Sequence, residues 1–509
     1  MRKFFTCSLL IAALIAASVP LPAGAGTETI ETRTRTGVPR FTLDEAILTA
    51  LQRNPEIQRA RQEIERTKGL YIEVRAEALP RVDASASFTQ TDPHLSRFTG
   101  DGGGPDFGTP RNYGLQIRAT QNVFTGGRVI SQLRSADFQR DASYFAFRDV
   151  IDLVIANVRQ QFYQILLNRA LIGVQEESVN LLQSQLQDQQ NRFEAGTVPR
   201  FNVLQAQVAL SNQQPDLISA RNNYRIAQLQ LARTIGLDFD PARGDGPPLE
   251  AVGVLRQERR SMPLAMAIEV AKERRPFLKQ QKANVLASNA QVGIARSGYF
   301  PQISATGGSD FRSSPISDNL NNTRSGYVFG ASGSWAIWDW GQTYGRVKQA
   351  RAQLEQAKIT YDDIGRQVEL EVQQAYSNLQ QGLQLIQSQT QNVGQAQEAL
   401  RLASARLGAG AGTQLEVLNA RVEVTRAQST SLQALFTYNA AVAEFDRVTA
   451  TEVTYSNALD EPRTRDKVKS DVRPTPPPKP TPLPLNNAGD REPVGDARPR
   501  MYSAPDFSK

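Results

Sequence analysis

The chain has 509 residues, a formal net charge of +7 and 40% apolar residues. Because the basic excess is mild and spread evenly, it favours solubility and argues against nucleic-acid binding. The sequence contains one histidine, His94, and one cysteine, Cys7. We therefore expect no metal and no cofactor, and a secreted enzyme is the weakest of the functions considered.

Residues 1–25 have the features of a secretory signal peptide. Arg2 and Lys3 supply positive charge, residues 4–19 are apolar, and Ala23-Gly24-Ala25 fits a cleavage site. The apolar core is too short to span a bilayer, which takes a helix of about 20 apolar residues. Because Cys7 lies within this segment, we expect the mature chain to lack cysteine and disulfides. No later segment looks like a membrane-spanning helix.

The rest of the chain contains two similar halves. Aligned positions lie 221 residues apart before the predicted hairpin loops, as in Pro80 and Pro301, and 214 apart after them, as in Gly127 and Gly341. Since the difference is confined to one loop, we interpret the halves as a tandem duplication. The predicted domains are the signal peptide (1–25), a first repeat (26–235), a linker (236–261), a second repeat (262–450) and a Pro-rich, disordered tail (451–509).

Each half begins with a predicted helix and continues as two strands. Thr42 followed by Glu45 is a capping-box pattern, and the first helix is expected to run toward Leu79, with Pro80 ending it. Beyond Pro80 the apolar and polar residues alternate, which is typical of half-buried strands. The predicted strands cover about 80–92, 112–124, 300–312 and 326–338.

Long helices follow the strands. Residues 128 through 191 and 342 through 405 contain no proline, and each stretch of 64 residues would extend roughly 95 Å as a helix. Apolar residues recur there every seven positions, which indicates a coiled coil, and an ordinary amphipathic bundle is the alternative. The predicted long helices are 128–191, 200–235, 342–405 and 413–450.

The four strands are too few to close into a barrel. A four-stranded sheet keeps two unpaired edges, whereas the smallest membrane barrels have about eight strands. Closed barrels are the only β structures that span lipid. We therefore expect several copies of the chain to contribute strands to one barrel, although the edges alone do not set the number of copies.

The sequence resembles the TolC-like outer-membrane efflux family between about Phe41 and Ala450. The shared motifs are Phe41-Thr-Leu-Asp-Glu-Ala46-Ile47, Asn54-Pro55-Glu56, Leu79-Pro80, Val123-Phe124-Thr125-Gly126-Gly127-Arg128, Arg192-Phe-Glu-Ala-Gly196 and Arg406-Leu-Gly-Ala-Gly410. The resemblance implies an α+β membrane protein with an internally duplicated helix–strand–strand–long helix–helix protomer. It further implies a homotrimer with a twelve-stranded β-barrel in the outer membrane and a periplasmic tube of twelve helices. The implied partners are a periplasmic adaptor protein, an inner-membrane pump and outer-membrane lipid.

The resemblance also implies two functional regions. The tips 192–201 and 406–415 would bind the adaptor. The alternative is that they are turns that only reverse the chain and have no binding role. The residues expected to dock the adaptor are Arg192, Phe193, Gly196, Arg406, Leu407 and Gly410. Both glycines suit the positive-φ position that ends a helix.

A pore constriction is the second region. Glu416 matches the first of two acidic pore residues of the family, but Asn419 stands at the second, so only one carboxylate ring is expected. Such a ring would favour cations, and the alternative is a solvated helix charge. Gly412 stands where the family has a basic latch residue, which puts that latch in doubt.

Three functions therefore compete. The first is passive export, as the outer-membrane channel of a tripartite efflux or type I secretion system. The second is a non-conducting periplasmic coiled-coil spacer, and the third is the secreted enzyme. The alternating strands favour the channel over the spacer, and the transported substrate stays open.

Overall fold

A computed structural model describes residues 38–92, 111–237, 248–257, 260, 262–313, 323–451, 453–454 and 481–482. All the elements below belong to the unit Arg40–Lys509. The predicted signal peptide, His94, part of the linker and most of the predicted tail lie outside the described residues.

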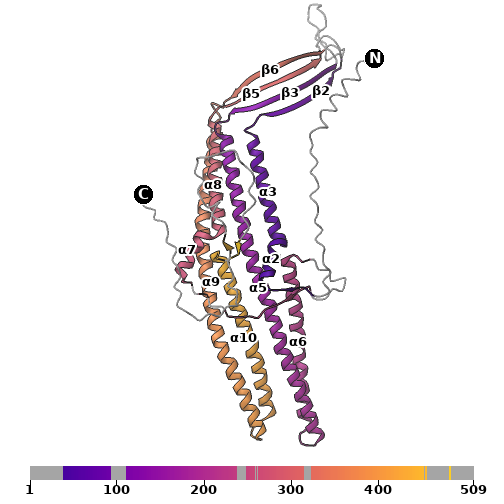
Figure 1. The fold of residues 1–509 in the computed structure, drawn as a ribbon. Coiled ribbons are helices and arrows are strands. Elements are labelled where there is room, and N and C mark those ends of the chain that lie inside the picture. Colours follow the sequence, from indigo (N-terminus) through magenta and orange to yellow (C-terminus); the bar gives the residue numbers. More distant parts are fainter. Residues whose placement is uncertain are drawn as a thin grey trace, which may run out of the picture. The chain divides into compact units, whose positions relative to one another are not determined.

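Within this unit the same series of elements occurs twice (Figure 1). The first series is α2 (Leu43–Arg53), α3 (Pro55–Ala76), β2 (Arg81–Gln90), β3 (Arg111–Phe124), α5 (Arg128–Glu194) and α6 (Arg200–Ile235). The second is α7 (Leu264–Arg274), α8 (Pro276–Arg296), β5 (Gln302–Ser313), β6 (Thr323–Ser334), α9 (Gln342–Gly408) and α10 (Gln414–Thr449). The starts of α2 and α7 lie 221 positions apart, and those of α5 and α9 lie 214 apart.

The N-terminal helix is interrupted, which corrects the expectation of one helix running toward Leu79. Thr42 and Glu45 form the predicted capping box at the start of α2. The chain then breaks at Asn54, because Pro55 has no N–H to continue the helical bonding. The Asn54 side chain accepts from the N–H groups of Glu56 and Ile57 at 2.7 and 3.2 Å, which caps α3.

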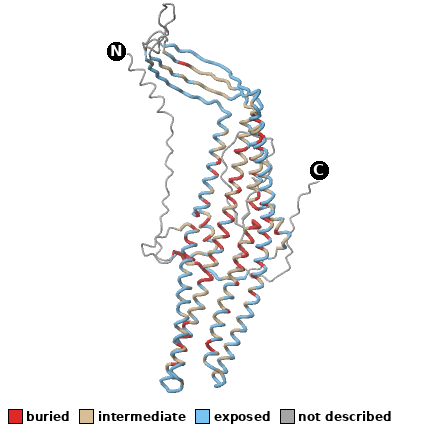
Figure 2. The backbone as a smooth tube through the Cα atoms, turned by 180° about the vertical axis from the view of Figure 1, so that it is seen from behind, coloured by how far each residue is buried: buried red, intermediate tan, exposed pale blue. Residues whose placement is uncertain are grey.

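The two longest helices, α5 and α9, each contain 67 residues. Each forms an antiparallel hairpin with the helix that follows it, α6 or α10 (Figure 1). Figure 2 shows buried positions along these helices. Between Ile364 and Ile386 of α9 they recur every three or four residues, as coiled-coil packing requires, whereas α5 is buried on more than one side. Among the described residues, no helix has both the length and the apolar composition needed to cross a lipid bilayer.

Each half has its own hydrophobic core. The first joins α2, α3, α5 and α6, with Phe162 and Leu231 fully buried, and the second joins α7, α8, α9 and α10 around Tyr438. Helix α5 contacts both halves, since it packs against α8 and α10 as well as α3 and α6. The linker adds β4 (Glu250–Ala251), which pairs with β1 (Arg40–Phe41) and buries Ala251 in the first core.

The four long strands form one antiparallel sheet in the order β2-β3-β5-β6. The two hairpins have equivalent registers, because Phe88↔Tyr113 in the first corresponds, at the same two offsets, to Ser309↔Tyr327 in the second. Strands β2 and β6 are the edges, and every residue in both is exposed. A two-residue pairing of β7 (Val453–Thr454) with β8 (Thr481–Pro482) lies within the predicted disordered tail, and the sequence does not predict it.

Cross-strand partners place the alternating residues of the sheet on two faces. Residues that lie directly opposite each other on antiparallel strands project from the same face. The apolar face carries the even residues of β2 and the odd residues of β3, β5 and β6, among them Val82, Ala84, Ala86, Phe88, Tyr113, Leu115, Ile117, Ala119, Ile303, Ala305, Phe311, Tyr327, Phe329 and Ala331. The opposite face, called here the polar face, carries the odd residues of β2 and the even residues of β3, β5 and β6, except at the end of β3, where the register shifts between Asn122 and Phe124.

Candidate functional site

The two helical hairpins end in turns of the same geometry. Gly196 and Gly410 have φ angles of +72° and +73°, so the predicted positive-φ positions are confirmed. In the first turn the N–H of Thr197 donates to the Arg192 carbonyl at 2.9 Å. In the second the N–H of Ala411 donates to the Arg406 carbonyl at 2.9 Å. These bonds satisfy the last carbonyls of each helix, so the turns are rigid C-terminal caps.

The side chains of the first tip are exposed. Arg192 forms an ion pair with Asp188 one helical turn earlier, at 2.9 Å. Phe193 is 44% exposed and Phe201, just beyond the turn, is 68% exposed. Large apolar side chains with this exposure are available to a partner or to another copy of the chain.

The second tip brings together Arg406, a predicted docking residue, and Glu416, a predicted pore residue. The guanidinium of Arg406 lies 3.6 Å from the carboxylate of Glu416 and also donates to the Ala411 carbonyl at 3.3 Å. Glu416 lies in the first turn of α10, which Thr413 caps by accepting from the Glu416 N–H at 3.2 Å. The charge of Glu416 is therefore partly balanced in this conformation.

The neighbouring predicted site residues have different surroundings. Leu407 is half-buried, Asn419 is exposed, and Asn419 lies among the residues that line a groove rather than beside the Arg406–Glu416 pair. Gly412 lies against the turn, where an added Cβ would be 3.0 Å from the Leu407 nitrogen. A side chain there would require the turn to shift by a few tenths of an ångström.

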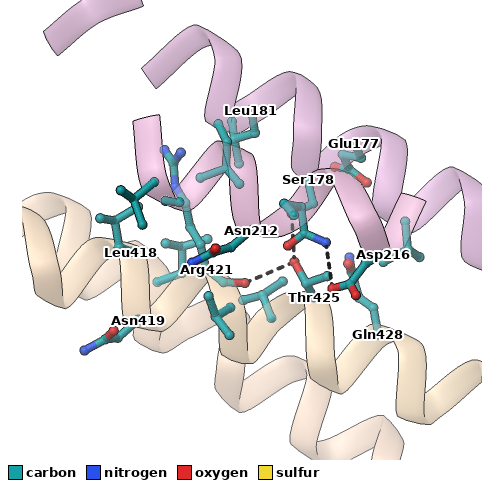
Figure 3. A pocket seen from close by; sticks show the side chains of 18 of the residues that line it. Glu177, Ser178, Leu181, Asn212, Asp216, Leu418, Asn419, Arg421, Thr425 and Gln428 are labelled. Carbon is teal, nitrogen blue, oxygen red and sulfur yellow. Dashed lines mark hydrogen bonds between the residues drawn. The ribbon is translucent and has the colours of Figure 1, made fainter. Parts of the chain in front are cut away.

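The groove lies between the first hairpin and α10 and has a volume of about 490 Å³. Figure 3 shows Arg421 and Thr425 of α10 near Ser178 of α5. Arg421 donates to the Gln185 side chain at 2.7 Å, and Thr425 donates to Ser178 at 3.5 Å. Burial lowers the pKa of the Arg421 guanidinium. The hydrogen bonds tie the two hairpins together above their tips.

A buried ionic cluster joins the halves further along the helices. The carboxylate of Asp446 on α10 accepts from Arg159 on α5 at 3.2 Å and from Arg260 of the linker at 3.0 Å. The Asp446 side chain is only 7% exposed, and that of Arg159 is 10% exposed. Burial raises the pKa of the Asp446 carboxyl, while Arg260 and Arg159 oppose the rise.

A second ion pair lies nearby at the junction of α7 and α8. Arg275, which is 5% exposed, pairs with Glu371 on α9, and Arg447 approaches the same carboxylate at 3.9 Å. Burial alone would raise the pKa of Glu371, but its bond with Arg275 lowers the pKa overall. Within the described ranges, no group of three or more His, Cys, Asp or Glu side chains is arranged to hold a metal ion.

A family model for outer membrane efflux proteins matches residues 46–237 and 267–451. The two matched blocks cover well over half of the 509 residues, and one block falls in each half of the chain. The chain belongs to the outer membrane efflux protein family. Membership makes this efflux protein an outer-membrane transport channel.

Named relatives of the efflux protein serve different transport systems. It is 24% identical over 391 residues to the solvent efflux pump outer membrane protein SrpC of Pseudomonas putida. The aligned region covers 74% of this chain and 78% of SrpC. It is 22% identical over 416 residues to the alkaline protease secretion protein AprF of Pseudomonas aeruginosa, covering 81% and 83% of the two chains.

A solved structure agrees with the fold of the efflux protein. The Campylobacter jejuni CmeC outer membrane channel superposes with a TM-score of 0.72 at 16% identity, covering 80% of this chain and 85% of that one. Identity at this level shows that the two proteins share an arrangement of helices and strands. It does not assign roles to individual residues.

Proposed function

We propose that the efflux protein is the outer-membrane channel of a tripartite efflux or type I secretion system. It passively conducts substrates from an inner-membrane pump and a periplasmic adaptor to the exterior. The observation that carries this proposal is the open four-stranded sheet, which has one apolar face and two fully exposed edges. A non-conducting spacer has no use for an apolar sheet face that no other element covers.

Three copies would close this sheet into a barrel of twelve strands above a tube of twelve helices. Closure pairs the exposed edges, and the apolar face then contacts lipid while the polar face lines the lumen. The internal duplication supplies the geometry of the contact between copies. Within one copy, β3 of the first half pairs with β5 of the second. The equivalent contact pairs β6 with β2 of the next copy.

This equivalence predicts the register between copies. Arg118 lies opposite Gly308 in the pair β3–β5. Moving 214 positions forward from Arg118 gives Ser332 on β6, and moving 221 back from Gly308 gives Ser87 on β2. Ser332 of one copy therefore lies opposite Ser87 of the next. Directly opposite Cα atoms are about 4.5–5.5 Å apart, which a disulfide can bridge.

Cysteine cross-linking tests this arrangement. The variant Ser87→Cys/Ser332→Cys should form covalent dimers and trimers on mild oxidation in membranes. Each single cysteine variant controls for random collision. Asp83→Cys/Ser332→Cys controls for register, because Asp83 lies four residues from Ser87 along β2, and its cysteine would be roughly 13 Å from the one at position 332. Equal cross-linking of both pairs would reject the register. The absence of cross-links in both, together with extraction by carbonate, would favour the spacer.

We also propose that the adaptor docks on the two hairpin tips. Support comes from their exposed side chains and their identical turn geometry. The docking residues are Arg192, Phe193, Gly196, Arg406, Leu407 and Gly410. The pore constriction is assigned to Glu416 and Asn419 on the turn of α10 that follows the second tip.

Channel recordings test the pore assignment. In planar bilayers, Glu416→Gln should reduce the preference for cations, because three carboxylates leave the constriction. Glu398→Gln is the matched control, since Glu398 is an exposed carboxylate of α9 paired with Arg401 at 2.6 Å. An unchanged preference in Glu416→Gln would remove Glu416 from the pore without affecting the channel proposal.

A further inference from the structure

All but one of the charged residues of the four strands lie on the polar face of the sheet. Four arginines and two aspartates project from it: Arg81, Asp83, Arg118, Asp310, Arg312 and Arg324. The exception is Arg111, which lies at the loop end of β3 on the apolar face. None of the four strands contains lysine or glutamate. The polar face thus carries a net charge of +2 in each copy (four arginines minus two aspartates).

Local ion pairs account for both aspartates. Asp83 pairs with Arg81 at 2.8 Å, and Asp310 pairs with Arg312 at 2.8 Å. In the part of the chain that the structure describes, no carboxylate lies within ion-pair distance of Arg118 or Arg324. Asp83 lies directly opposite Arg118 in the pair β2–β3, although its ion pair is with Arg81. The face keeps a net charge of +2, and Arg118 and Arg324 are its two arginines without an ion pair among the described residues.

Arg324 also has a like-charged neighbour. It lies directly opposite Arg312 in the pair β5–β6, so two guanidinium groups occupy adjacent positions on one face. Like charges in this position repel each other and destabilise a sheet. The pairing of Arg312 with Asp310 offsets part of this repulsion. An anion bound by Arg324 would offset more of it, because guanidinium groups bind carboxylates and phosphates through paired hydrogen bonds.

The surroundings of the arginines leave them as the longest side chains on the polar face. The residue opposite Arg118 on β5 is Gly308, and the residue opposite Arg312 on β3 is Gly114. At Gly308 an added Cβ would overlap the Ile117 carbonyl oxygen, so only glycine fits there. Most other positions on this face are serine, threonine or glycine. Arginines that rise above such a surface dominate its electrostatic potential.

We propose that the polar face lines the barrel lumen as a cationic surface that favours anionic solutes, with Arg118 and Arg324 as its selectivity-determining residues. This inference rests on the proposed channel function and narrows its substrate class to molecules that carry carboxylate, phosphate or sulfate groups. Three copies would bring six uncompensated arginine charges into one lumen. Rings of arginine or lysine select anions in other pores.

Reversal potentials in planar bilayers under a KCl gradient test the inference. Wild type and Arg118→Gln/Arg324→Gln are compared, each also in a Glu416→Gln background that removes the tip carboxylates. A change of about half a kT in lumen potential alters the cation-to-anion ratio roughly threefold. The double variant should therefore raise the K⁺ to Cl⁻ permeability ratio by at least about threefold, and Arg118→Lys/Arg324→Lys should keep the wild-type ratio.

Arg111→Gln is the matched control, because it removes an arginine from the other face of the strand that carries Arg118. It should leave the ratio unchanged. An unchanged ratio in a double variant that still conducts would overturn the inference and leave the channel proposal standing. If the double variant forms no channels, the single Arg324→Gln variant should show about half the shift on a logarithmic scale, and no shift there would equally overturn the inference. Failure of wild type to conduct would instead reject the channel proposal.

Discussion

Replacing Gly236 with alanine should destabilise the efflux protein through a specific clash. Gly236 ends α6 with a φ of +71°, and a Cβ there would lie 2.6 Å from the carbonyl oxygen of Arg53 and 2.9 Å from its carbonyl carbon. That carbonyl cannot retreat easily. The next residue, Asn54, is 4% exposed, caps α3 and donates to the Thr234 carbonyl at 2.7 Å.

The expected loss in the free energy of unfolding has two parts. A left-handed backbone costs a residue with a Cβ about 1–2 kcal/mol. Forcing extra atoms into a filled site adds about 1–3 kcal/mol, giving about 2–5 kcal/mol for Gly236→Ala. Gly410→Ala isolates the first part, because Gly410 has a similar φ of +73° and no atom within 4 Å of its added Cβ. We expect this control to cost only about 1–2 kcal/mol.

Thermal unfolding followed by circular dichroism measures the difference. The unfolding entropy of a chain this long is roughly 1 kcal/mol per kelvin, so the two substitutions should lower Tm by about 2–5 °C and about 1–2 °C respectively. Both variants are compared in the same detergent at one scan rate, since unfolding of such an assembly need not be reversible. Equal shifts for the two variants would refute the argument from the Arg53 contact.

Three further substitutions test side-chain contacts. Arg406→Gln should increase the cation preference of the channel in bilayer recordings, because it removes a positive charge beside the Glu416 carboxylate, and the increase should be smaller when Glu416 is already glutamine. Asp446→Ala should cost about 3 kcal/mol by removing buried charge-assisted bonds, and pairing it with Arg159→Leu should recover part of that loss in Tm. Glu371→Gln should lower Tm at neutral pH. The folded-state pKa of Glu371 lies below its ordinary value of 4.5, so the ionised carboxylate stabilises the fold above pH 4.5. The difference in Tm between the variant and wild type should disappear as the pH falls below 4.5 and through the lowered pKa.

Features set by neighbouring residues were predictable from the sequence. The capping box of Thr42 and Glu45 and the left-handed glycines Gly196 and Gly410 follow from local backbone chemistry. The break at Asn54 was also local, since an Asn-Pro pair both caps a helix and lacks an N–H. The periodic apolar pattern concealed it, because α2 and α3 bury their faces against the same core.

Contacts between distant residues were not predictable in the same way. Arg159 and Asp446 are 287 positions apart, and neither shows locally that the other lies within 3.2 Å. A charged residue among buried heptad neighbours is the one available signal, and it does not name its partner. The alternation of apolar and polar residues predicted two faces for each strand. It did not predict that the apolar faces of all four strands lie on the same side of the sheet, because that depends on the register between strands.

The two charged regions of the channel should act independently. Helix α9 runs from the sheet end to the second tip over 67 residues, or roughly 100 Å. That separation far exceeds the distance over which charges interact at physiological salt, which is about 8 Å. The Arg118→Gln/Arg324→Gln variant should therefore raise the K⁺ to Cl⁻ permeability ratio both in wild type and in the Glu416→Gln background. A reversed sign of that change in the Glu416→Gln background would show that the tip and the sheet are coupled through a change in conformation, because direct electrostatic interaction cannot span the helix.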